Sequence, residues 1–231
     1  MSYFFIPTKR PEDWKPLLAE PDKNWRTGYS AKAIAYCWQN ADGFPSEIRK
    51  VFRGSGIPIF KNIEMLMAFP EYRVPLPGEK KDSQIDIFVL AKGNEQLISV
   101  SVEGKSDEPF GEVISEWKLE ESSGKVERLT YLCDQLMLNK ELVDSIHYQL
   151  LQKMASVVIE AKKFNASNAL MLIHAFQKTR EKYTENFQAY CRFLKLFGKQ
   201  GKGNAIVLLK TLNSIDLYAG WVKGNKKYLE A

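Results

Sequence analysis

Two strand-like runs decide the fold of this chain: Ser83-Gln84-Ile85-Asp86-Ile87-Phe88-Val89-Leu90 and Gln96-Leu97-Ile98-Ser99-Val100-Ser101-Val102-Glu103-Gly104-Lys105. Valine, isoleucine and phenylalanine are frequent in both, which is typical of β-strands. A short polar turn, residues 92–95, separates them. The pattern predicts a β-hairpin that carries one acid within its first strand and a Glu-x-Lys sequence at the end of its second.

The spacing of these polar residues predicts that they meet. Side chains alternate between the two faces of a strand. With residues 92–95 as the loop, Asp86 lies opposite Ser101 and becomes a diagonal neighbour of Glu103, about 7–8 Å away at the backbone. Lys105 projects to the same side as Glu103. A register slip of one residue would send Asp86 to the other face, so the prediction depends on the pairing.

Two carboxylates and a lysine on one face are the groups that metal-assisted phosphodiester cleavage needs. Mg²⁺ takes oxygen ligands, usually one or two carboxylates with substrate phosphate and water, and Mn²⁺ is a substitute. We therefore expect Asp86 and Glu103 to bind the metal and Lys105 to assist the attacking water. Gly104 between them would let backbone approach the metal or substrate closely.

The same residues also fit a purely structural interpretation. In it, Asp86 is a solvent-facing strand residue, and Glu103 with Lys105 forms a surface ion pair that contributes little to stability. Glu-x-Lys alone is a common sequence. The functional interpretation rests on the strand–turn–strand context, on the matched parity and on an acid embedded in an apolar run.

The order of these elements resembles the PD-(D/E)xK, or restriction-endonuclease-like, nuclease superfamily over about residues 59–175. The shared features are a strand with Asp86, a strand that ends in Glu103-Gly104-Lys105, and a following helix. The proline of the pattern is absent, because Ile85 precedes Asp86. The resemblance implies a restriction-endonuclease-like core, with a mixed sheet flanked by helices, and Mg²⁺-dependent cleavage of nucleic acid.

The resemblance also implies two further site residues. Many members carry an acid on a helix before the first strand, and Glu64 is the matching position in a helix expected over residues 59–69. Some carry a glutamine on the helix after Glu-x-Lys, and Gln149 is the candidate here. Some members of such superfamilies have lost activity, so the fold alone does not fix the function.

Length and composition are those of a soluble globular protein. The 231 residues, 45% of them hydrophobic and 26% charged, favour one α/β domain. We divide it into an N-terminal helical and irregular segment (1–58), a catalytic core (59–175) and a basic C-terminal part (176–231). No apolar run is long enough to span a bilayer, and the three scattered cysteines indicate reduced core residues. A cytoplasmic protein without membrane contact is expected.

Charge is unevenly distributed along the chain. Residues 176–231 hold 11 basic and four acidic residues, a balance of +7, whereas the first 175 residues balance at −2. A basic part joined to an acidic core suits a protein that grips phosphate while it cuts it. A solvated basic surface without a ligand is the alternative.

Hydrophobic periodicity predicts the remaining elements. Helices are expected at 30–38, 126–136, 140–164 and 183–197, and buried strands at 169–176, 205–209 and 215–222. His174, in the first of these buried strands, is expected to be a hydrogen-bonded core histidine. With these elements the fold class is α/β, a mixed central sheet flanked by helices on both faces.

The function predicted from the sequence is Mg²⁺-dependent hydrolysis of DNA. The alternative is a non-catalytic nucleic-acid-binding or protein-interaction module on the same fold, which needs no metal. Sequence-specific cutting of both strands would favour a homodimer with two-fold symmetry.

Overall fold

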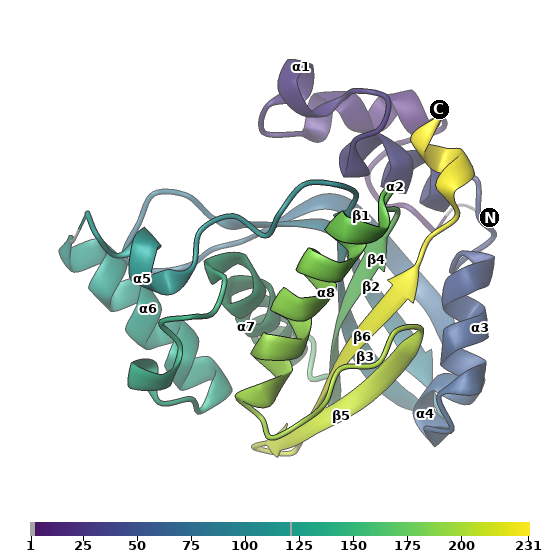
Figure 1. The fold of residues 1–231 in the computed structure, drawn as a ribbon. Coiled ribbons are helices and arrows are strands. Elements are labelled where there is room, and N and C mark those ends of the chain that lie inside the picture. The colour runs from purple at the N-terminus through teal and green to yellow at the C-terminus, as the bar shows by residue number, and fades with distance from the viewer. Residues whose placement is uncertain (1–2, 121) are drawn as a thin grey trace.

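A single mixed sheet forms the centre of the molecule in the computed structural model, which describes residues 3–120 and 122–231 (Figure 1). Its six strands are β1 (Glu64–Val74), β2 (Ser83–Gly93), β3 (Gln96–Lys105), β4 (Asn168–Ala175), β5 (Ala205–Leu212) and β6 (Ile215–Lys223). They lie in the order β1-β2-β3-β4-β6-β5. Strands β3, β4 and β6 are parallel neighbours, and the other pairs are antiparallel. The expected α/β class with a mixed sheet is confirmed.

Helices cover both faces of this sheet (Figure 1). One face carries α2 (Ser30–Gln39), α3 (Ser46–Gly54) and α4 (Pro58–Lys61). The other carries α6 (Ser123–Leu136), α7 (Tyr148–Lys163) and α8 (Arg180–Lys195). Shorter elements complete the chain: η1 (Pro11–Leu17), α1 (Pro21–Asn24), α5 (Ile114–Trp117), η2 (Lys140–Leu142) and η3 (Lys226–Leu229).

The central strand β4 shows why both faces are covered. All eight of its residues are buried. Leu170 and Leu172 pack in the layer under α2, whereas Met171 and Ile173 pack in the layer under α7. A continuous apolar run is the pattern of a strand buried on both faces, so the prediction for residues 169–176 is confirmed.

The β2–β3 hairpin forms as predicted, but its register differs. Gly93 pairs with Gln96, so the turn consists of Asn94 and Glu95 alone. Both have left-handed φ values, 44° and 61°, which two-residue hairpin turns of type I′ require. The prediction of a four-residue loop over residues 92–95 is therefore wrong, because Lys92 and Gly93 belong to β2. Phe88, not Asp86, lies opposite Ser101, a shift of two residues that preserves the parity on which the site prediction depends.

The helix expected over residues 59–69 is also wrong. Helix α4 ends at Lys61, and residues 64–74 form the edge strand β1 instead. The apolar residues of this segment fit helical spacing, but the segment pairs with β2 along nearly its whole length. Backbone hydrogen bonds to a neighbouring strand override a weak local preference.

The helix expected over residues 140–164 begins later than predicted, at Tyr148. The segment before it pairs with a distant loop: Ile114 N donates to Ile146 O at 2.8 Å, and Val113 forms a β-bridge with His147. Residues 143–147 therefore form a turn, closed by Ile146 N donating to Val143 O at 2.8 Å, that leads into the bridge at His147. The first turn of α7 lies beside the end of β3, where Gln149 contacts Glu103.

The C-terminal part completes the sheet. Residues 176–231 supply α8, β5 and β6, and β6 pairs with β4 along eight residues. Within residues 3–120 and 122–231, no helix is both long and apolar enough to cross a membrane.

Candidate functional site

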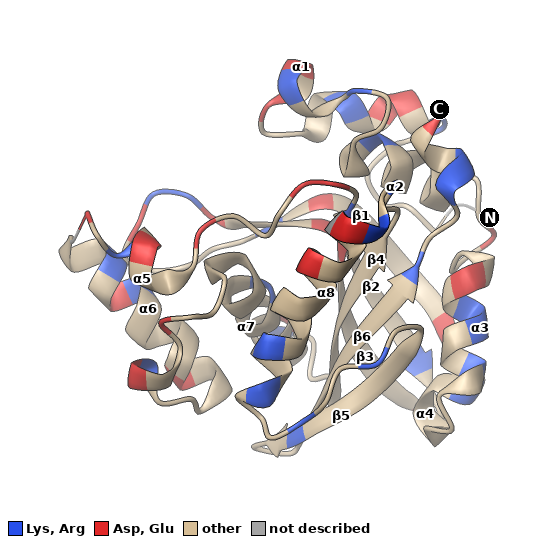
Figure 2. Ribbon diagram, viewed as in Figure 1, with Lys and Arg blue, Asp and Glu red and all other residues tan. Residues whose placement is uncertain are grey.

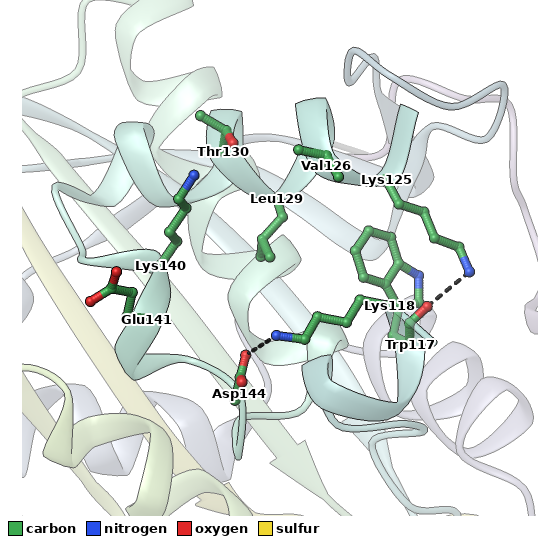
Figure 3. A pocket seen from close by; sticks show the side chains of 9 residues that line it. All are labelled: Trp117, Lys118, Lys125, Val126, Leu129, Thr130, Lys140, Glu141 and Asp144. Atoms are coloured by element: carbon green, nitrogen blue, oxygen red, sulfur yellow. Dashed lines mark hydrogen bonds and ion pairs between the residues drawn. The ribbon is translucent and has the colours of Figure 1, made fainter. Parts of the chain in front are cut away.

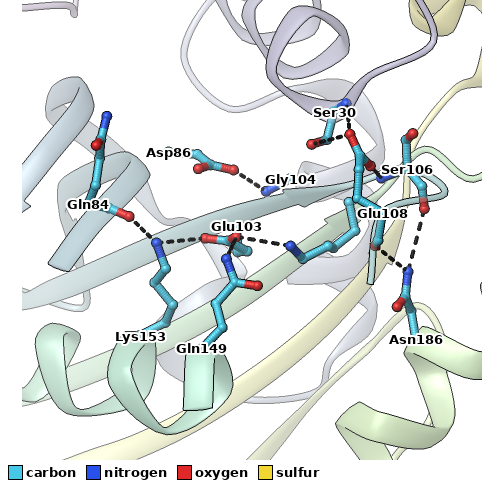
Figure 4. Close-up of polar contacts among 11 residues, drawn as sticks. Ser30, Gln84, Asp86, Glu103, Gly104, Ser106, Glu108, Gln149, Lys153 and Asn186 are labelled. Atoms are coloured by element: carbon cyan, nitrogen blue, oxygen red, sulfur yellow. Dashed lines mark hydrogen bonds and ion pairs between the residues drawn. The ribbon is translucent and has the colours of Figure 1, made fainter. Parts of the chain in front are cut away.

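A cavity of about 420 Å³ opens at one end of β2 and β3, between the first turns of α2 and α7. Ionisable and amide side chains from three strands and one helix converge on it, and Figure 4 shows those that come from β2, β3 and α7. They are Glu71, Gln84, Asp86, Glu103, Lys105, Gln149 and Lys153. Four of the five residues expected at the site, all except Glu64, are among them.

Asp86 lies where the hairpin opens. The β2–β3 pairing ends at Ile87 and Val102, and Asp86 and Glu103 are the next residues on the two strands. Asp86 Oδ2 accepts the Gly104 amide at 2.7 Å. Burial and the nearby Glu103 carboxylate together raise the pKa of Asp86 from 3.8 to about 7. Part of the side chain remains open to the cavity.

Glu103 is the centre of the charged network, and its side chain is only 3% exposed. Its Oε1 accepts the Gln149 amide at 2.5 Å and lies 3.3 Å from Lys105 Nζ. Its Oε2 lies 3.0 Å from Lys153 Nζ. Burial acts to raise the pKa of Glu103, but the two lysines outweigh it and lower that pKa below its ordinary 4.5. Glu103 is therefore an anion at neutral pH.

Lys105 and Gln149 reach Glu103 from different elements. Lys105 follows Glu103 by two residues on β3, so both project to the same face, and its ammonium also lies 4.9 Å from the centre of the Phe110 ring. Gln149 stands in the first turn of α7. The prediction that these residues meet at the Asp86 end of the hairpin agrees with this geometry.

Glu64 is not brought to the site. It is exposed and pairs with Lys92, next to the hairpin turn and at the opposite end of β2 from Asp86. The expectation that it lies beside the metal ligands is wrong, because it depended on the helix that β1 replaces. Glu71, at the other end of β1, takes that place.

Glu71 is the first residue that the sequence reasoning missed. Its φ of 53° lies in the left-handed region, which non-glycine residues rarely adopt and which is often found at functional sites. Gln84 Nε2 donates to its Oε2 at 2.6 Å. Burial and the proximity of Asp86 raise the pKa of Glu71 from 4.5 to about 8. The sequence carries no signal for this backbone conformation.

Lys153 is the second missed residue, and here a signal existed. It lies one helical turn after Gln149, within a polar stripe beside the apolar stripe of α7. The stripe continues through Ser156 and Glu160, and the side chains of Lys153, Ser156 and Glu160 are all buried. A polar stripe that is adjacent to a core-facing one indicates buried polar partners.

The acidic loop after β3 plays a structural role. Glu108 Oε1 accepts the backbone amide of Ser30 at 2.9 Å, and its Oε2 accepts that of Ser106 at 2.9 Å (Figure 4). The side-chain amide of Asn186 on α8 donates to the Glu108 carbonyl at 3.0 Å. These bonds fasten the loop to the start of α2 and to α8, and so fix one wall of the cavity.

The donor set fits a hard divalent cation. Glu103 Oε2 is buried and, although it lies within ion-pair distance of Lys153, it has no hydrogen-bond partner of good geometry among the described residues. Gly104 engages one of the two carboxylate oxygens of Asp86, which leaves Oδ1 as a ligand atom. Mg²⁺ prefers such carboxylate oxygens, and its charge would favour the ionised form of Asp86.

A second group of ligand-type side chains lies on the opposite face, under α2. Sγ of Cys37, a carboxylate oxygen of Glu47 and a ring nitrogen of His174 lie within 4.8 Å of one another. The indole of Trp38 donates to His174 Nδ1 at 3.1 Å. A neutral ring that accepts at Nδ1 carries its proton on Nε2, and Nε2 is the nitrogen 3.5 Å from Glu47. A metal ligand needs that nitrogen deprotonated, so this cluster fits a metal poorly.

The other charged surfaces show no comparable convergence. Figure 2 shows lysine and arginine spread over α1, α3, α6 and α8 rather than gathered on one element. A cavity of about 390 Å³ between α5, α6 and η2 contains three lysines (Figure 3). There Lys118 pairs with Asp144 at 2.7 Å, and Lys125 donates to the Trp117 carbonyl at 2.8 Å. Two of the three lysines are thus held by local partners.

Comparison with known proteins places the chain in a family. A family model described as a domain of unknown function (DUF6946) matches residues 7–226, so the chain belongs to that family. No curated protein and no solved structure matches it. The matched residues include every side chain of the cavity, but the family description names no activity.

Proposed function

We propose that this protein is a metal-dependent nuclease that hydrolyses phosphodiester bonds of DNA. The observation that carries the proposal is the convergence of Asp86, Glu103 and Lys105 in one cavity at the open end of a hairpin. The order of elements supports it: a strand with the acid, a strand that ends in Glu-x-Lys, and a helix with Gln149. A restriction-endonuclease-like core is part of the proposal.

Each residue has a distinct role in this proposal. Asp86 and Glu103 would hold Mg²⁺, with Mn²⁺ as a substitute, and the bound ion would polarise the phosphoryl oxygen and lower the pKa of a water. Gln149 holds Glu103 Oε1 through its 2.5 Å hydrogen bond and so orients the carboxylate. Lys105 supplies a positive charge for the developing negative charge of the phosphate and helps to orient the attacking water.

One observation favours the non-catalytic alternative, a module that binds nucleic acid or protein without a metal. Gln149, Lys105 and Lys153 already surround the two oxygens of Glu103. Such a network could be a structural ion cluster that needs no cation. The two functions differ in whether metal binding depends on Asp86 and Glu103.

The test is cleavage of supercoiled plasmid and of single-stranded DNA with Mg²⁺ or Mn²⁺. Glu103→Ala and Lys105→Ala are expected to lose cleavage by about 10²-fold or more. Glu95→Ala and Lys92→Ala are matched controls, since these residues form an ion pair of the same type at the exposed turn of the same hairpin. Both controls should cut normally. Equal activity in all four variants, or no cleavage by the unmodified protein, would reject the nuclease.

A further inference from the structure

Lys153 occupies an unusual position within the cavity. Its side chain is 6% exposed, and its ammonium lies 3.0 Å from Glu103 Oε2. It also donates to the backbone carbonyl of Gln84 on β2. A carboxylate oxygen and a main-chain carbonyl oxygen are ligands that a divalent cation would take at such a point. Here a fixed ammonium lies against both: it donates to the Gln84 carbonyl and approaches Glu103 Oε2 without a hydrogen bond of good geometry, so that this oxygen is still open to one metal ion on its other side.

The charges around the ammonium explain why it is held there. Glu71, Asp86 and Glu103 line the cavity with it from β1, β2 and β3, and all three carboxyl groups interact with the ammonium favourably. Lys105 is held differently, by Glu103 Oε1 and the Phe110 ring. The two lysines therefore approach Glu103 at different oxygens.

We propose that the ammonium of Lys153 takes the place of a second metal ion, so that the site binds one divalent cation rather than two. The inference rests on the proposed function and specifies its metal requirement. Two-metal sites place their ions about 3.5–4 Å apart on shared carboxylates. A fixed ammonium against Glu103 Oε2 and the Gln84 carbonyl excludes a second ion from that side by charge and by volume. Lys153 is thus a positioning residue that neutralises charge.

The experiment is a calorimetric titration of the metal-free full chain with Mn²⁺. The unmodified protein is expected to bind one Mn²⁺. Lys153→Gln is expected to bind two, with the first bound about tenfold more tightly because a nearby positive charge is removed. Lys153→Arg keeps the charge and should still bind one. Lys162→Gln, an exposed lysine of the same helix, is the matched control and should behave as the unmodified protein does.

The outcomes separate this inference from the proposed function. Two Mn²⁺ in the unmodified protein, or one Mn²⁺ at unchanged affinity in a folded Lys153→Gln, overturns the role of Lys153 and leaves the nuclease intact. No Mn²⁺ in the unmodified protein rejects the metal site and the inference together. Should Lys153→Gln fail to fold, the stoichiometry of the unmodified protein and of Lys153→Arg decides: two ions in either contradict the inference, and one ion in both supports it.

Discussion

Two polar clusters lie on opposite faces of the same sheet, and they differ in how their charges are satisfied. In the cavity beside α7, three acids share two lysines, and two of the acids, Glu71 and Asp86, have pKa values raised to about 8 and 7. Under α2, by contrast, the ring of His174 lies between Trp38, which donates to Nδ1, and Glu47, which faces Nε2.

The difference teaches that buried charge alone does not identify a binding site. In the α2 cluster Trp38 donates to Nδ1 of His174, and Nε2 faces the Glu47 carboxylate at 3.5 Å without a hydrogen bond of good geometry among the described residues. What distinguishes the cavity is that it holds more acids than cations and opens to solvent. An excess of acceptors in an open cavity is what a cation would complete.

The largest expected effect is a loss of stability in Glu103→Gln, which we compare with the loss in Glu47→Gln. Glu103→Gln leaves two buried lysines without their shared counter-charge and should lower the free energy of unfolding by about 3–5 kcal/mol. Glu47 is 20% exposed, so the loss for Glu47→Gln should be about 1 kcal/mol. Urea unfolding at pH 7 without metal measures both. Equal losses would show that the two clusters do not differ as described.

The second prediction concerns the pH dependence of stability in the cavity. Because the pKa of Asp86 is raised from 3.8 to about 7 in the folded state, the folded protein binds more protons than the unfolded chain between these values. Stability is therefore lost as pH rises from about 4 to 7. Asp86→Asn should make this slope shallower, leaving the part that the raised pKa of Glu71 contributes. It should also raise the free energy of unfolding at pH 7.5 by about 1–2 kcal/mol, a value reduced because the Asp86 side chain is partly exposed. Metal-free urea unfolding at several pH values checks it, and an unchanged slope in Asp86→Asn would contradict the raised pKa.

The features that sequence could predict in this site are local. Asp86, Glu103 and Lys105 lie on one hairpin, and the two-residue period of its strands fixes their parity even though the register was two residues off. Gln149 was reached by resemblance, and α7 does place it against Glu103. Most of the strands and helices followed from their hydrophobic runs for the same local reason.

The features that sequence could not predict depend on distant contacts. Ile63, Leu66 and Met67 recur at helical spacing, and only the pairing of this segment with β2 shows that it is a strand. Glu64 was misplaced in consequence. Glu71 reaches the cavity through a left-handed φ, which no neighbouring residue signals. Lys153 differs from these two, because the polar stripe of α7 does signal it, and the packing of α7 against the sheet shows that it is buried.

The third prediction is that the α2 cluster makes stability depend on pH in the direction opposite to that of Asp86. Burial lowers the pKa of His174 below 6.5, although Glu47 acts in the other direction. The folded state then binds fewer protons than the unfolded chain, so stability is present above pH 6.5 and is lost as pH falls below it. His174→Gln should remove this loss between pH 7 and 5. The effect should be smaller than that of Asp86, and a steeper acid loss in His174→Gln would contradict a neutral buried histidine.

The smallest expected effect is the response of the α2 cluster to Zn²⁺, which should be none. Burial and the Glu47 carboxylate raise the pKa of the Cys37 thiol, so it is protonated at neutral pH, and the proton on His174 Nε2 faces the place where an ion would sit. Thermal unfolding with and without equimolar Zn²⁺ should give the same Tm in the unmodified protein and in Cys37→Ser. If Zn²⁺ raised the Tm of the unmodified protein and not that of Cys37→Ser, the cluster would be a metal site. The contrast between the two faces would then rest on the kind of metal each binds, a hard ion held by carboxylates on one and a softer ion held by thiolate and imidazole on the other.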